Sequence, residues 1–206
     1  MPYAMMQGKT SDTTHQVARI DSSTHGQIVI DYEHHEVHDG SAFTCNYSNS
    51  VTNIGEMTAI AFNTPNTTKY IHLTFTAEAT GGATFALYEA PSIDVDEGTA
   101  LAIYNRNRNS TTPSTLLSVE ATPVANSVTS YNETQAAGAN ISTTTRLIYH
   151  IIGSGGNQPT AGQTRAQTEF VLKKNTQYAV VMSSLTNDDA SHTITLVWYE
   201  HTDKGA

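Results

Sequence analysis

The chain has 206 residues, of which 19 are acidic and 10 basic, so that its formal net charge is −9 and only 14% of its residues are charged. This acidic balance argues against binding to nucleic acid or to anionic membranes, because both kinds of binding rely on Lys and Arg. The single cysteine, Cys45, excludes an internal disulfide, and no apolar run reaches the roughly 18 residues of a membrane-spanning helix. Neutral polar residues replace the missing charges, and such a surface can be buried against a partner without desolvating many charges.

Residues 1–26 are polar, rich in Thr, Ser and His, and without a sustained period. Such a segment is too polar to bury a core of its own, so we expect an extended N-terminal arm over 1–26, followed by one domain over 27–206. Laid across a neighbouring subunit, the arm would gain apolar contacts and would add a strand to an exposed sheet edge. Its interface candidates are Tyr3, Met5, Met6 and Arg19.

Short alternating runs follow the arm, and each predicts a strand. The first three cover residues 27–30, 41–47 and 57–62. Residues 69–77 alternate clearly, Gly81 and Gly82 offer a tight turn, and residues 83–89 return, which predicts a hairpin. A second meander is predicted over residues 170–172, 178–182 and 193–199. Two segments interrupt the strands: residues 113–140 are rich in Ser, Thr and Ala and only weakly periodic, and the Gly-rich residues 153–163 are expected to form a long loop.

Closely spaced strands without an amphipathic helix predict an all-β protein, an antiparallel β-sandwich of jelly-roll type. The apolar side of each alternating run should form its core. The predicted core residues are Ile71, Leu73, Phe75, Phe85, Leu87, Ile194, Leu196 and Trp198. Cys45 alternates with apolar neighbours and is interpreted as a small core residue rather than a nucleophile.

Residues 31–40 are rich in His and acidic residues, and His34 and His38 are the candidate metal ligands of the chain. The spacing departs from a zincin, which needs two residues between His-Glu and the second His, whereas only Val37 separates Glu36 from His38. Three ligands on one strand rarely converge on one ion, so we interpret the segment as a polar strand or turn. We therefore expect no metal, no cofactor and no enzymatic activity.

Arg106 and Arg108 lie two residues apart in an Asn-rich segment, which would place them on one side of an extended chain. Such a pair can grip a carboxylate or a phosphate. The acidic residues Asp94, Asp96 and Glu97 nearby offer a simpler interpretation, in which both arginines pair within the protein or across a subunit boundary. Arg106 and Arg108 are therefore counted among the interface candidates.

Several short motifs occur in an order that resembles one known family. They are ARIDSSTH (18–25), DYEHHEVHDG (31–40) with Phe43 after it, TKYIHL (68–73), LYEAP (87–91), YNRNRN (104–109) and WYEHTDK (198–204). This order resembles virion structural proteins of tailed bacteriophages, the capsid decoration or cement proteins. The resemblance implies a β-sandwich bound to the outside of a phage particle, and it carries no set of functional residues.

Taken together, the residues and the resemblance predict a capsid decoration protein that binds the major capsid protein or other virion proteins and forms a homo-oligomer. A virion protein made in the bacterial host cytoplasm needs neither a disulfide nor a signal peptide, and residues 1–10 lack the apolar segment of a signal peptide. The alternatives are a tail- or fibre-associated protein that binds a receptor, a carbohydrate-binding module and, ranked last, a metal-dependent enzyme that uses the His-rich segment.

Overall fold

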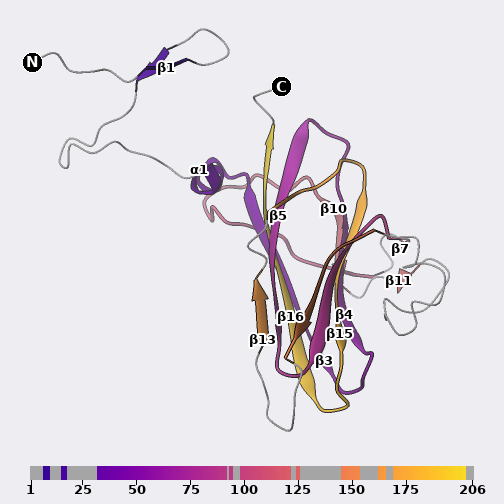
Figure 1. Ribbon diagram of the computed structural model, residues 1–206. Coiled ribbons are helices and arrows are strands. Elements are labelled where there is room, and N and C mark those ends of the chain that lie inside the picture. The colour runs from indigo at the N-terminus through magenta and orange to yellow at the C-terminus, as the bar shows by residue number, and fades with distance from the viewer. Residues whose placement is uncertain are drawn as a thin grey trace, which may run out of the picture.

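The protein is described from a computed structural model, and the fold is an all-β sandwich of two antiparallel sheets, as predicted. The residues that the structure describes are 7–9, 15–17, 32–91, 93–94, 98–121, 124–125, 145–153, 162–165 and 169–202. Figure 1 shows the two sheets as facing layers whose strands run along the long axis, with the short helix α1 (Tyr32–Asp39) at one end.

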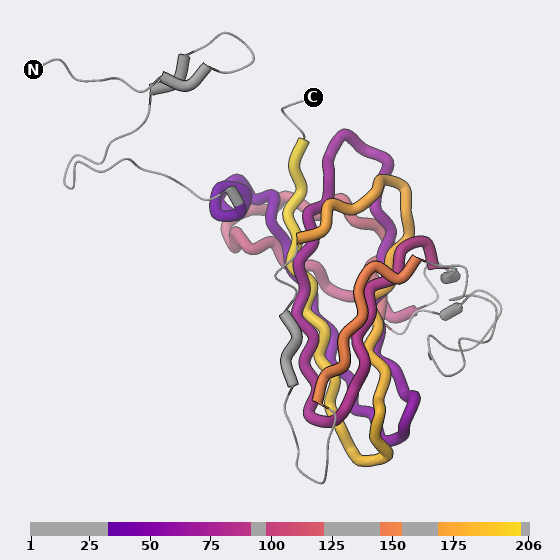
Figure 2. The backbone as a smooth tube through the Cα atoms, in the orientation of Figure 1, coloured from indigo at the N-terminus to yellow at the C-terminus, as the bar shows by residue number. Residues whose placement is uncertain are grey.

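Sheet I has the strand order β13-β5-β16-β3-β9, and β14 also pairs with β5. Its strands are β3 (Ala42–Val51), β5 (Lys69–Ala79), β9 (Tyr104–Asn105), β13 (Gly162–Arg165), β14 (Phe170–Val171) and β16 (Ala190–Thr202). The last strand in the chain, β16, is thus central in this sheet, and Figure 2 shows its yellow trace running alongside the magenta trace of β5.

Sheet II has the strand order β12-β6-β15-β4-β10-β8. Its strands are β4 (Met57–Asn63), β6 (Ala83–Glu89), β8 (Thr99–Ala100), β10 (Leu117–Ala121), β12 (Thr145–Ile152) and β15 (Gln177–Ser184). Two short pairs lie outside the sandwich sheets. They are β1 (Gln7–Lys9) with β2 (His15–Val17) and β7 (Ile93–Asp94) with β11 (Val124–Ala125).

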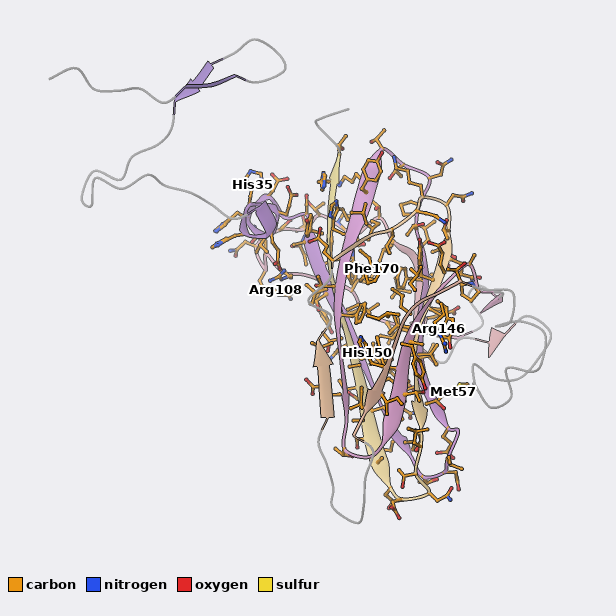
Figure 3. The ribbon with its side chains drawn as sticks, in the orientation of Figure 1. His35, Met57, Arg108, Arg146, His150 and Phe170 are labelled. Atoms are coloured by element: carbon orange, nitrogen blue, oxygen red, sulfur yellow. The ribbon has the colours of Figure 1, made fainter. Side chains whose placement is uncertain are left out.

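The core lies between the sheets and contains every residue predicted for it. Trp198 stands opposite Leu73 on one side and Phe43 on the other, and its ring stacks on Phe43 with centroids 5.9 Å apart. Cys45 belongs to the same cluster, so its interpretation as a core residue is confirmed. Phe170 packs against this cluster from β14, at the position labelled in Figure 3.

The predicted hairpin across Gly81 and Gly82 is wrong, although both of its strands exist. Strand β5 belongs to sheet I and β6 to sheet II, so the chain crosses from one layer to the other at this point. Neither glycine has a positive φ. At Gly82 the lack of a side chain lets the backbone of Gly153 come close, because a Cβ on Gly82 would lie 2.7 Å from the carbonyl oxygen of Gly153.

The predicted meander near the C-terminus is wrong in the same way. Its strands β14, β15 and β16 exist, but they lie alternately in sheet I, sheet II and sheet I. Asn175, in the connection between the first two, has a φ of 49°, a conformation that Asn tolerates in turns. The predictions placed the strands correctly but paired each with its neighbour in the chain, whereas the edges of β15 are occupied by β4 and β6.

Segment 31–40 was predicted to be a polar strand or turn, and this is wrong because residues 32–39 form α1. Gly40, with a φ of 78°, ends the helix in a Schellman motif. Its two hydrogen bonds are Gly40 N–H to the Val37 carbonyl at 3.2 Å and Ser41 N–H to the Glu36 carbonyl at 2.9 Å. The helix escaped prediction because it buries little more than Glu36 and therefore has no apolar stripe.

The remaining predictions divide between described and undescribed residues. Residues 113–140, predicted to interrupt the strands, contain β10, and the loop predicted over 153–163 reaches into β13, so both predictions are wrong at those residues. The predicted strand over 27–30 lies outside the described residues. The arm predicted over 1–26 is described only at β1 and β2 and otherwise stays a prediction.

Candidate interface on the outer face of sheet I

The outer face of sheet I presents neutral side chains from three adjacent strands. Alternation produces this face, because residues such as Leu73 and Leu196 point into the core and their neighbours point outward. The register aligns the outward residues in rows across β3, β16 and β5. We call this set the hydroxyl face, and its rows are Thr44–Val197–Thr74, Asn46–Thr195–Thr76 and Ser48–Thr193–Glu78. Glu78 is the one charged residue in these rows.

Several polar groups of the hydroxyl face are already bonded within the sheet. The Thr44 hydroxyl donates to the carbonyl of Leu196 at 2.9 Å, and the Thr74 hydroxyl donates to the carbonyl of Val197 at 3.3 Å. The hydroxyls of Ser48 and Thr193 lie 2.9 Å apart. A hydroxyl with a partner inside the sheet keeps that bond when a second surface removes the water, so covering these four hydroxyls costs little desolvation energy.

A cluster of rings closes one end of the hydroxyl face. His72 of β5 stacks on Tyr199 of β16 with centroids 4.5 Å apart, and His201 lies the same distance from His72. Glu169 accepts hydrogen bonds from His72 Nδ1 at 2.5 Å and from the Tyr199 hydroxyl at 2.9 Å. We call His72, Glu169, Tyr199 and His201 the ring cluster.

A further hydrogen bond joins the two histidines of the ring cluster. The Nε2 atoms of His72 and His201 lie 2.7 Å apart, and which of them donates depends on the tautomer. The arrangement anchors Glu169, which precedes β14, to the two long strands of sheet I.

His34 and His38, the metal candidates, lie one turn apart on α1 rather than on a strand. Their Nε2 atoms are 2.9 Å apart, and the exposed rings stack with centroids 4.7 Å apart. Two imidazoles at this spacing can touch one ion. Within the part of the chain that the structure describes, no group of three or more His, Cys, Asp or Glu residues could hold a metal ion.

The arginine pair does not lie on an extended chain, because residues 106–109 form turns after β9. Arg106 pairs with Glu33 of α1 at 2.5 Å, so the prediction that it pairs within the protein holds for Arg106, although its partner is not the acidic run at 94–97. Arg108 lies over the ring of Tyr104, 5.5 Å from the centroid. Figure 3 labels Arg108 on the same side of the molecule as α1.

The other interface candidates of the sequence are not described. Tyr3, Met5, Met6 and Arg19 all fall outside the described residues. The ring cluster and the hydroxyl face were not predicted as a site, although the alternation of β5 and β16 contained the signal. Every second residue of β5 and β16 was assigned to the core. The residues between them point outward, and most of them are neutral.

A buried carboxylate was also missed. Glu200 is 1% exposed and lies on the inner side of β16, where it accepts a hydrogen bond from the indole Nε1 of Trp198 at 3.2 Å. It also accepts from the Ser114 hydroxyl at 2.6 Å and from the Thr115 amide and hydroxyl at 2.9 and 2.7 Å. Glu200 therefore fastens the irregular segment before β10 to the end of sheet I.

Two buried groups bear on possible chemistry. Burial raises the pKa of the Cys45 thiol to about 12, so the thiolate needed for nucleophilic attack is disfavoured. Burial lowers the pKa of His192, whose Nδ1 atom lies 3.3 Å from the Thr58 hydroxyl between the sheets. Neither side chain reaches solvent, and both act as parts of the interior.

An open cleft lies beside β8 and β10. Its one acidic side chain, Glu120, accepts a hydrogen bond from the backbone amide of Gly98 at 2.8 Å. The other lining residues are Ala100, Leu101, Ile103, Leu116, Ser118 and Val119. A lone carboxylate engaged by the backbone, in an otherwise mostly apolar lining, does not make a pair of acid and base groups.

Comparison with known proteins adds no family. No protein-family model matches the chain, and no curated protein matches it significantly. Among the described residues, no helix has the length and apolarity to span a membrane. The likeness to phage decoration proteins thus rests on the sequence motifs alone.

Proposed function

We propose that this protein is a virion structural protein, a capsid decoration (cement) protein that binds the outer surface of an assembled phage head. The observation that carries the proposal is the hydroxyl face, a surface of three adjacent strands whose rows contain one charged side chain, Glu78, in the last row. The buried centres of protein interfaces are depleted in charged residues, since each unpaired charge would have to be desolvated.

The geometry of the face suits a rigid partner. Three long strands hold it in one register over many residues, so little conformational entropy is lost when it is covered. Val197 adds apolar area on the central strand, between Thr44 and Thr74, whose hydroxyls already make hydrogen bonds within the sheet. A preorganised surface of this kind suits repeated contacts with the regular lattice of a capsid.

Binding to the lattice accounts for the stabilising role. A protein that binds the assembled shell, and not its dissociated subunits, shifts the equilibrium toward the shell by mass action. Many copies bound at equivalent positions add their contributions. The partner in this proposal is the major capsid protein, and no catalytic step or cofactor is involved.

The test compares two matched variants that add the same charge. Thr195→Glu places a carboxylate in the middle row of the hydroxyl face, whereas Thr111→Glu places one in an exposed loop. Heads assembled without the protein are mixed with each variant and sedimented. We expect Thr195→Glu to reduce the bound fraction at least tenfold, and Thr111→Glu to bind as the wild type does.

Electron cryo-microscopy of the same particles identifies the bound surface. Density for the sandwich on the head, with sheet I toward the shell, is the expected result. Equal binding of both variants, or density only on the tail, would show that the proposal is wrong. The second outcome would support the tail-associated alternative instead.

A further inference from the structure

Strand β3 has one complete edge and one that is mostly open. Along its whole length β3 pairs with β16, from Ala42 opposite Tyr199 to Val51 opposite Ala190. On its other side only Phe43 and Thr44 pair, with the two residues of β9. Over residues 45–51 no strand among the described residues pairs with that second side.

The alternation of N–H and C=O directions along a strand identifies which backbone groups of β3 point to the open side. The amide of Arg106, which follows β9, donates to the carbonyl of Ala42 at 2.8 Å, so the groups of residue 42 point toward this side. In a regular strand the N–H and C=O groups of every second residue point the same way. Asn46, Ser48 and Ser50 therefore present their backbone donors and acceptors at the open edge.

This edge lacks the usual protection against pairing. Natural edge strands avoid association through charged side chains, prolines or β-bulges. Residues 45–51 contain no charge and no proline, and the register of β3 against β16 runs without a shift. The edge strand β12 of sheet II differs, because its register shifts between Arg146 and Ile148.

We propose that β3 pairs with β3 of a second copy of this chain, in antiparallel orientation about a two-fold axis at Ser48. Ser48 then faces Ser48 of the second copy, and Asn46 faces Ser50. These residues all carry the open backbone groups, so each facing pair exchanges both of its N–H···O bonds. Sheet I of one copy and sheet I of the other then form one continuous sheet across the two-fold axis.

A second copy fits because a two-fold interface opposes a surface to itself. A charged edge would meet like charge there, whereas Asn46, Ser48 and Ser50 are neutral and can act as both donors and acceptors. The outward side chains of these residues belong to or border the hydroxyl face. Pairing therefore joins the hydroxyl faces of two copies into one larger surface. The use of this surface for binding a capsid rests on the proposed function, whereas the pairing itself does not.

The test uses the full chain in solution, without particles. The wild type should have twice the chain mass of 22.2 kDa by light scattering after size exclusion. Ser48→Lys and Ser48→Glu each place like charges across the axis, so each variant alone should run as a monomer, with half the wild-type mass. An equimolar mixture of the two should recover the dimer, because opposite charges then meet. Thr111→Lys, in an exposed loop, should remain dimeric.

The outcomes separate the edge from the proposed function. A monomeric wild type, a dimer in either Ser48 variant, or a mixture that stays monomeric would each overturn the pairing at Ser48. Circular dichroism of each variant checks that the sheet content is retained. Loss of head binding by a protein that remains dimeric would count against the decoration function and would leave the paired edge intact.

Discussion

Replacing Glu200 tests the arrangement at the end of sheet I. In Glu200→Ala the amide of Thr115 loses an acceptor that lies 2.9 Å away, whereas the indole of Trp198 keeps the Ser114 hydroxyl as an acceptor at 3.2 Å. A buried donor left without a partner costs about 1–3 kcal/mol. The hydroxyls of Ser114 and Thr115 are only half-buried and can turn to water, so their loss adds little.

We therefore expect a loss of about 1–3 kcal/mol in the free energy of unfolding, because the orphaned amide of Thr115 dominates it. For a chain of this size that corresponds to a fall in Tm of roughly 3–10 °C. Glu200→Gln keeps one carbonyl acceptor but turns an amide group toward donors, and we expect it to lose about 1–2 kcal/mol. If lost hydrogen bonds cause the destabilisation, Glu200→Ala should be less stable than Glu200→Gln.

Trp198 provides the assay, since it is the only tryptophan of the chain and contacts the substituted side chain. Urea unfolding followed by its fluorescence measures the free energy, and limited proteolysis between residues 111 and 116 reports whether the segment is released. Asp189→Ala removes an exposed carboxylate in the turn before β16 and should change the free energy by no more than about 0.5 kcal/mol. A Glu200→Ala protein as stable as this control, with unchanged emission, would refute the reasoning.

Other predictions concern the core, the interior histidine, the layer crossing and metal. Trp198→Ala should cost about 3–5 kcal/mol by thermal melts in circular dichroism, since a fully buried indole leaves a cavity. Burial lowers the pKa of His192, so the unfolded chain binds its proton more readily. The free energy of unfolding should be unaffected by this group above about pH 6.5 and should fall as the pH drops below it, and His192→Leu should flatten that fall in urea titrations at several pH values. Gly82→Ala should destabilise by about 1–3 kcal/mol in urea, because its Cβ would meet the Gly153 carbonyl at 2.7 Å. Chelators should leave Tm unchanged, whereas stoichiometric zinc by elemental analysis that His34→Ala abolishes would contradict that expectation.

The strands could be predicted from sequence because alternation is a local property. Ile71, Leu73 and Phe75 mark one face of β5 without reference to any other strand. Pairing is not local, since it depends on which edges remain free after the layers assemble. Strand β6 follows β5 directly in the chain, yet its edges are occupied by β15 and β12.

Irregular strands hid other elements. In β10 the register shifts between Leu117 and Glu120, and Ser118 has a φ of 47°, so Val119, Glu120 and Ala121 are buried in succession and alternation is lost. The buried role of Glu200 was open to prediction, because it lies two residues after Trp198 and therefore on the same face of the strand. A carboxylate on an inward position predicts a hydrogen-bond network, although its partners at 114–115 come from a distant segment.

The central position of β16 has a consequence for the time course of folding. During synthesis β3 and β5 leave the ribosome long before residues 190–202, yet these two strands meet only through β16. Until β16 is available, sheet I cannot form, so the apolar faces of both strands stay uncovered and several of their edges are exposed to other chains. Sheets joined by contacts so distant in sequence close slowly. Nascent chains of this protein should therefore depend on chaperones until the last strand is made, and ribosome-bound chains that end before residue 190 should be cleaved readily by proteases.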